Sequence, residues 1–184
     1  QSHIFVRSSE KSSLQDLWRG LLNEDFSLKA GLGIDELLSL GSVYINQARV
    51  TNSNSEILEN DLVEIYRKPK RYTIPDLYSR VIHEEKDFLI VHKPANLPCH
   101  PTVDNFEENL LIGYLKIFGE NIFLPHRLDV ATEGLMILAR SEQALTKITI
   151  LFSTHQITKK YLVLVEGSWK QLGVLTHFMK PDAR

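Results

Sequence analysis

The sequence is poor in cysteine and has no long stretch of uncharged apolar residues. Cys99 is the single cysteine among 184 residues, so neither an internal disulfide nor a cysteine-based zinc site is expected. No run of about 18 apolar residues occurs, which excludes a transmembrane helix of ordinary length. The first residues also lack the basic start and apolar core of a secretory signal. These absences predict a cytoplasmic protein with no membrane segment.

An excess of positive charge is missing too. Lysine and arginine total 21, aspartate and glutamate total 23, and the formal net charge is −2. Nucleic-acid-binding proteins usually carry a basic excess, so the total argues mildly against such a role. Basic residues nevertheless gather at 67–71 and at Lys159 and Lys160, where an ordinary solvated surface is the competing interpretation. The initiator methionine is absent as well, which predicts a trimmed chain or missing early residues.

The first 66 residues alternate between helical and strand patterns. A helix is predicted from apolar residues at helical spacing, namely Leu14, Leu17, Trp18, Leu21 and Leu22. A second helix is predicted over 34–40, ended by Gly41. Short strands are predicted over 42–46 and 62–66, with a turn at 46–48. We therefore expect a small α/β module at 1–66.

A stretch rich in basic residues and proline follows at 67–79 and is predicted to be a linker. The rest of the chain, 80–184, predicts strands over 87–93, 134–139 and 161–165 and helices over 107–118 and 142–153. Strands and helices are mixed without regular alternation. The fold class is therefore predicted to be α+β, with a mixed, mainly antiparallel sheet and flanking helices in the second domain.

The most informative motif is HRLDVATEGLMILAR, which runs from His126 to Arg140. Arg127 and Asp129 stand two residues apart, so both would point to the same face of an extended backbone. Burying a carboxylate without a partner costs several kcal/mol. This pair is therefore expected either to form a structural ion pair or to direct an acid at a substrate.

The pattern H-R-L-D-x-x-T-x-G-L, followed by K-K-Y-L-x-L-V-x-G, closely resembles the RluA-type pseudouridine synthases. Those enzymes convert a uridine within RNA into its C-glycoside isomer. The resemblance implies that Asp129 is catalytic, either attacking C1′ as a nucleophile or removing the C2′ proton as a base. It also implies that Arg127 binds phosphate or fills the space of a flipped base, and that Tyr161 lies against the target uracil.

Two lysines are expected to assist. The strand that ends at Lys93 and the Pro-rich loop after it match a second pattern of the family, so Lys93 is expected to support the site or the RNA backbone. Lys160 is expected either to contact phosphate or to be solvated. The chemistry requires no metal or organic cofactor, and the histidines lack metal-ligand spacing. His126 is expected to donate a structural hydrogen bond.

Residues 14–66 resemble the alpha-L RNA-binding module that many pseudouridine synthases carry, although its usual Arg-Leu-Asp start is absent. The partner implied is a structured rRNA or tRNA, with no obligatory protein partner. Family members continue with a T-G-[RK]-x-H-Q-[IL]-R motif, whose basic residue pairs with the catalytic aspartate. This chain contains no such motif and is expected to be an incomplete synthase. The alternative is a noncatalytic RNA-binding protein built on a decayed synthase domain.

Overall fold

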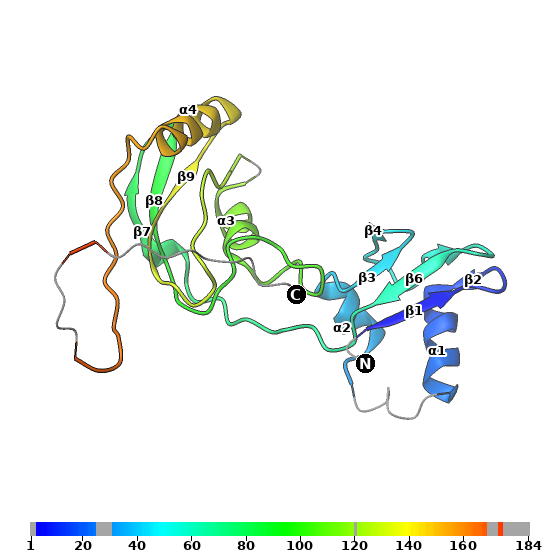
Figure 1. Ribbon diagram of the computed structural model, residues 1–184. Helices are drawn as coiled ribbons and strands as arrows, with labels where there is room; N and C mark the ends of the chain where they lie inside the picture. The colour runs from blue at the N-terminus through cyan, green and yellow to red at the C-terminus, as the bar shows by residue number, and fades with distance from the viewer. Residues whose placement is uncertain (1–2, 25–30, 120, 169–172, 175–184) are drawn as a thin grey trace.

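A computed structural model of the chain describes residues 3–24, 31–119, 121–168 and 173–174 (Figure 1). Its helices and strands form two groups, an N-terminal group up to residue 66 and a C-terminal group from residue 77 onward. Each group is built around its own cluster of buried apolar side chains. Residues 175–184, which the predicted second domain includes, lie outside the described residues. The mixture of helices with antiparallel sheets confirms the predicted α+β class.

The N-terminal group is an antiparallel sheet with helices packed on one face. The strand order is β1 (Ile4–Arg7), β6 (Leu62–Ile65), β3 (Val43–Ile45) and β4 (Ala48–Arg49). The helices are α1 (Leu14–Glu24) and α2 (Ile34–Ser39), and β2 (Ser12–Ser13) pairs separately with β5 (Glu56–Ile57). Alternate residues of β6 face the helices and are buried, as expected for a sheet with one covered face.

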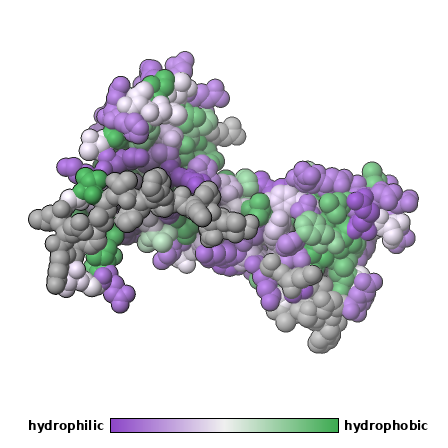
Figure 2. Space-filling view, in the orientation of Figure 1, coloured by the Kyte–Doolittle hydropathy of each residue, from purple (hydrophilic) through white to green (hydrophobic). Residues whose placement is uncertain are grey.

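No described helix covers the opposite face of this sheet. Its central cross-strand row consists of Phe5, Glu64, Tyr44 and Arg49. Phe5 remains 55% exposed, and Figure 2 shows hydrophobic side chains at the surface over this sheet, bordered by hydrophilic ones. The β3 and β4 end of the row instead contacts the C-terminal group.

The C-terminal group has three layers. The antiparallel sheet β7 (Val81–Glu84), β8 (Phe88–Lys93) and β9 (Gly134–Ala139) lies between α3 (Leu110–Phe118) and α4 (Glu142–Ser153), and a 3₁₀ helix (Tyr78–Arg80) precedes it. One face of β8 and β9 packs against α3, and the other face packs against α4. The buried positions of β8 alternate and end at Lys93, which places a lysine at a core position.

The strand predicted over 161–165 is wrong. These residues have no regular structure, and the side chains of Leu162 and Leu164 are fully exposed. A strand requires a neighbour to satisfy its backbone N–H and C=O groups, and no described strand pairs with this segment. The helix predicted to begin at residue 107 begins later, at Leu110, because Asn109 is its cap and accepts a hydrogen bond from the N–H of Ile112.

Substituting Gly41 is expected to weaken the contact between the two groups. Gly41 has φ +70°, and a Cβ built on it would lie 2.6 Å from Cβ of Phe106. Gly41→Ala should therefore lower the free energy of unfolding by about 2–4 kcal/mol. Gly20→Ala is the control, because Gly20 lies within α1 with nothing within 4 Å of its built Cβ, and helix propensity should raise its stability by about 1 kcal/mol. A Gly41→Ala protein no less stable than the wild type in urea would contradict the close approach.

Candidate active site

Asp129 lies in a tight turn immediately before β9. The N–H of Thr132 donates to the carbonyl of Asp129 at 3.1 Å and closes residues 129–132, called here the Asp129 turn. Leu128 packs against the core of the C-terminal group, whereas Arg127 and Asp129 on either side of it are exposed. Both charged residues therefore lie on the solvent side of this segment.

Lys93 holds the Asp129 turn from the buried side. Its side chain is completely buried at the end of β8. The Nζ atom donates to the carbonyls of Thr132 at 2.7 Å, Pro94 at 2.9 Å and Val130 at 3.1 Å. Three acceptors satisfy the three donors of the ammonium group. Of the two roles predicted for Lys93, support of the site fits this position, whereas RNA contact does not fit a side chain with no exposed surface.

Charge also connects Lys93 with Asp129. Burial lowers the pKa of Lys93 from its usual value, and Cys99 and the Asp129 carboxylate oppose that decrease. Among the described residues, no hydrogen bond or ion pair occupies the Asp129 carboxylate, and Arg127 does not pair with it. The structure therefore does not contain the structural ion pair that was one interpretation of the motif. The acid is left facing solvent.

Cys99 fixes the residue on the other side of Asp129. Its thiol donates to the carbonyl of Leu128 at 3.2 Å, and its sulfur lies 3.4 Å from the Leu128 nitrogen as an acceptor. Burial raises the pKa of Cys99, so the thiol remains protonated at neutral pH. Leu128 and Val130, the two neighbours of Asp129, are thus both held by buried side chains. Sequence reasoning missed Cys99 as a site residue, because a lone cysteine carries no motif signal.

His126 is an acceptor in the structure, not the predicted donor. Its Nε2 accepts the N–H of Ile137 at 3.0 Å, and its ring packs on Phe152 with the ring centroids 4.2 Å apart. The Ile137 N–H belongs to a strand edge that no described strand pairs at this position, so it needs an acceptor. Burial, helped by nearby Lys159, lowers the pKa of His126 to about 4.

Acidification should therefore weaken the fold through His126. The unfolded imidazole, with its pKa of 6.5, takes up a proton before the folded one, whose pKa is about 4. The free energy of unfolding should fall as the pH falls from 6.5 toward 4, by a total on the order of 2–3 kcal/mol. Urea unfolding across this range should show a shallower pH dependence for His126→Gln, which keeps an acceptor but cannot be charged. Parallel curves for the two proteins would contradict a neutral buried imidazole.

The remaining two predicted substrate-binding residues are not brought to Asp129. Lys160 is exposed, Tyr161 is 60% exposed, and within the part of the chain that the structure describes no contact joins either to Asp129. The preceding residue, Lys159, has its Nζ 6.0 Å from the ring centroid of Phe152. The segment after α4 thus meets the C-terminal group at Lys159 and leaves the next two side chains in solvent.

The arrangement around Asp129 has the properties of a site for an anionic substrate. Arg127 lies close enough to His100 to lower its pKa, together with the larger effect of burial. The exposed guanidinium can bind phosphate, while the exposed carboxylate can act as nucleophile or base. Within the described ranges, no group of three metal-ligating side chains is placed to hold an ion. No described helix is long and apolar enough to cross a membrane.

Residues 87–183, which include Lys93 and Asp129, match the family described as RNA pseudouridylate synthase. An uncharacterized RNA pseudouridine synthase of Helicobacter pylori is 31% identical over 123 residues, which cover 67% of this chain and 40% of that protein. Another, of Mycoplasma capricolum, is 32% identical over 144 residues, covering 70% and 48%. The ribosomal large subunit pseudouridine synthase D of Buchnera aphidicola is 28% identical over 142 residues, covering 73% and 46%.

The chain thus spans about half the length of the curated relatives it matches. The family match itself extends over more than half of the chain. It contains the Asp129 turn together with Lys93 and Cys99, which hold it. The chain therefore belongs to the RNA pseudouridylate synthase family.

Proposed function

We propose that the protein isomerises specific uridines in structured RNA to pseudouridine, with Asp129 as the catalytic residue. The observation that supports this most strongly is the exposed, unpaired carboxylate of Asp129 on a turn fixed by Lys93 and Cys99. A carboxylate with a structural task would be paired, whereas this one is free to reach a bound ribose. Membership of the family supports the reaction class.

The proposed reaction breaks the bond from N1 of uracil to C1′ and forms a bond from C5 to C1′. Ionised Asp129 either attacks C1′ or removes the proton from C2′, and both roles need a carboxylate without a competing partner. The freed uracil rotates and rejoins the sugar through C5, whose proton is then released. No water is consumed, so one carboxylate suffices where glycosidases use two.

The exposed Arg127 is proposed to bind a phosphate next to the target or to fill the space of the flipped base. No contact among the described residues joins Tyr161 to Asp129, so stacking of Tyr161 on the target uracil would require the two residues to meet around the bound nucleotide. Because the relatives are about twice as long as the chain, we propose that residues other than Lys93, Cys99 and the Asp129 turn complete the uracil pocket.

Ribosomal RNA is the favoured substrate over tRNA, because several relatives are named for the large ribosomal subunit. We propose an alpha-L-like module at 1–66, a linker at 67–79 and the synthase part at 80–184. The buried free thiol of Cys99 is compatible with a reducing compartment, so the cytoplasm is the proposed location.

In vitro transcribed rRNA and tRNA labelled with tritium at C5 of uridine test this function. Release of tritium from one pool, with one pseudouridine formed for each proton lost, is expected. Binding of both RNAs without release from either would instead support the decayed synthase. The assay requires the longest form of the protein that its gene encodes.

Tyr161 provides a separate prediction. Stacking of a base on its ring is worth ~1–3 kcal/mol, so Tyr161→Ala should weaken RNA affinity by that amount and lower turnover, whereas Tyr161→Phe should keep most of the affinity. Stability should not change, because the side chain is exposed. Tyr78→Ala is the control, since Tyr78 is similarly exposed at 66%. Unchanged affinity and rate in Tyr161→Ala would exclude stacking.

A further inference from the structure

We infer that the N-terminal group acts as a brace. It stabilises the loop at 103–106, whose contacts lead to the backbone beside Asp129, and it does not itself bind the RNA phosphates. The bracing contacts are a property of the fold and do not depend on any activity. The expectation that their loss slows uridine isomerisation rests on the proposed function. Two independent observations carry the inference: the contacts that join the two groups, and the distribution of charge between them.

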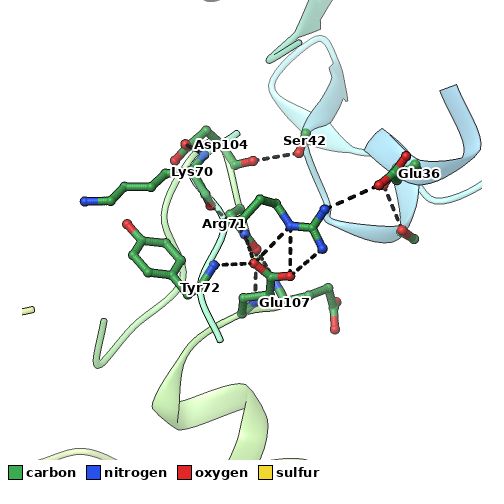
Figure 3. A network of polar contacts seen from close by, with 10 residues as sticks. Glu36, Ser42, Lys70, Arg71, Tyr72, Asp104 and Glu107 are labelled. Atoms are coloured by element: carbon green, nitrogen blue, oxygen red, sulfur yellow. Dashed lines mark hydrogen bonds and ion pairs between the residues drawn. The ribbon is translucent and has the colours of Figure 1, made fainter. Parts of the chain in front are cut away.

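Two hydroxyl groups, one on the residue before β3 and one within β3, hold residues 103–106, called here the docking loop. Ser42 Oγ donates to the carbonyl of Asp104 at 2.6 Å, a bond drawn in Figure 3. The hydroxyl of Tyr44 donates to the carbonyl of Val103 at 2.9 Å. Both acceptors belong to the backbone, so these bonds fix the path of the docking loop regardless of its side chains.

Phe106 closes the same contact. Its N–H donates to the carbonyl of Leu40 at 2.7 Å. Its ring lies under Arg49, with Cζ of the guanidinium 3.0 Å from the ring centroid. Nη1 of Arg49 is buried and has no hydrogen-bond partner among the described residues, so stacking on Phe106 takes the place of a polar contact.

Arg71 and Glu108 tie the linker to both groups. Glu108 accepts hydrogen bonds from Nη2 of Arg71 at 2.8 Å and from the N–H of Tyr72 at 2.7 Å. Nη1 of Arg71 reaches Glu36 of α2 at 3.3 Å, as Figure 3 shows. Burial alone would raise the pKa of Glu108, but its hydrogen bonds from Arg71, Tyr72 and Asn105 hold it below the usual value. The carboxylate is therefore ionised at neutral pH and holds Arg71, whose guanidinium in turn reaches α2.

The docking loop is connected through α3 and Cys99 to the backbone beside Asp129. It precedes α3, whose first two N–H groups donate to the carbonyls of Pro98 at 2.9 Å and Cys99 at 3.1 Å. Cys99 in turn holds the backbone of Leu128. A continuous series of contacts therefore runs from the N-terminal sheet through the docking loop and the start of α3 to the residue before Asp129.

Charge argues against phosphate binding by the same group. Residues 1–66 contain five basic and ten acidic residues, a net charge of −5, whereas residues 67–184 contain sixteen basic and thirteen acidic residues, a net charge of +3. The charged residues of the two helices are Asp16, Arg19, Glu24, Asp35 and Glu36. Affinity for RNA depends on cations that neutralise phosphates. Arg19 is the one cation on these two helices, and it already pairs with Asp16 at 3.3 Å.

Hydrogen–deuterium exchange on the full chain tests the brace without requiring activity. Ser42→Ala combined with Tyr44→Phe removes both hydroxyl bonds while keeping charge and ring. Exchange should quicken roughly fivefold or more over residues 103–108 and 126–133 and stay unchanged in α1. Tyr66→Phe is the control, because within the described chain the Tyr66 hydroxyl makes no hydrogen bond. Should the double variant fail to fold, Tyr44→Phe alone provides the same comparison.

A docking loop that loosens while residues 126–133 keep the wild-type exchange rates would overturn the brace.

The charge argument is tested by the salt dependence of total rRNA binding. Arg7→Gln combined with Arg19→Gln should leave the slope of affinity against salt unchanged, while Arg127→Gln should reduce it by about one. A reduced slope in the double variant would overturn the exclusion of the N-terminal group from phosphate binding. If the chain proves inactive, the exchange result still stands, so failure of the proposed function remains distinguishable.

Discussion

Replacing Lys93 by methionine should remove about 2–4 kcal/mol from the free energy of unfolding and slow uridine isomerisation at least about a hundredfold. Methionine has a similar volume but cannot donate, so three carbonyls lose their partner at once. Each unsatisfied buried acceptor costs about 1–3 kcal/mol, and the relief of no longer burying a charge offsets part of the total.

The loss of rate has a separate cause from the loss of stability. Two of the three carbonyls belong to the Asp129 turn, so the carboxylate would no longer be held in one position relative to the ribose. A displacement of about 1 Å is enough to cost a factor of 10². Urea unfolding and tritium release measure the two effects. Lys86→Met is the control, because Lys86 is an exposed lysine between β7 and β8. A Lys93→Met protein as stable and active as the control would contradict the anchoring role.

The elements whose residues alternate or repeat against a core are those that the sequence predicts best. The strand at 134–139 and the helix at 142–153 have the predicted bounds, because their apolar spacing reflects burial on both faces of one sheet. Edge strand β7 was missed, since its side chains are mostly exposed and its pairing with β8, not its own pattern, makes it a strand. The strand predicted at 161–165 is the reverse case. Its sequence has the pattern of a strand, but no described strand pairs with it, so it forms none.

The site was only partly accessible to sequence reasoning. The motif singled out Arg127 and Asp129, which the structure exposes on either side of the partly buried Leu128. It could not show that Lys93 points inward to three backbone carbonyls, because that depends on a turn 37 to 39 residues farther along the chain. Nor could it pair Cys99 with Leu128, a contact 29 residues apart in sequence. Such contacts follow from how strands β8 and β9 align, and no local pattern encodes them.

Asp129→Asn is the other substitution expected to have a very large effect. Asparagine keeps the shape of the side chain, and no described partner is lost because the carboxylate has none. Folding stability and RNA affinity should therefore remain within about 0.5 kcal/mol of the wild type. Turnover should fall by about 10²–10⁴-fold or more, because the amide can neither attack C1′ nor accept the C2′ proton. Glu133→Gln is the matched control, since it neutralises an exposed carboxylate four residues away.

The measurement that tests the role of Asp129 most directly is the release of the C5 proton from tritium-labelled rRNA. Wild-type protein, Asp129→Asn and Glu133→Gln are compared at RNA concentrations that saturate all three, in preparations free of wild-type contamination. Release by the wild type and by Glu133→Gln, with none above background for Asp129→Asn, is the predicted result. Substantial release by Asp129→Asn would contradict the assignment of Asp129 as the catalytic residue.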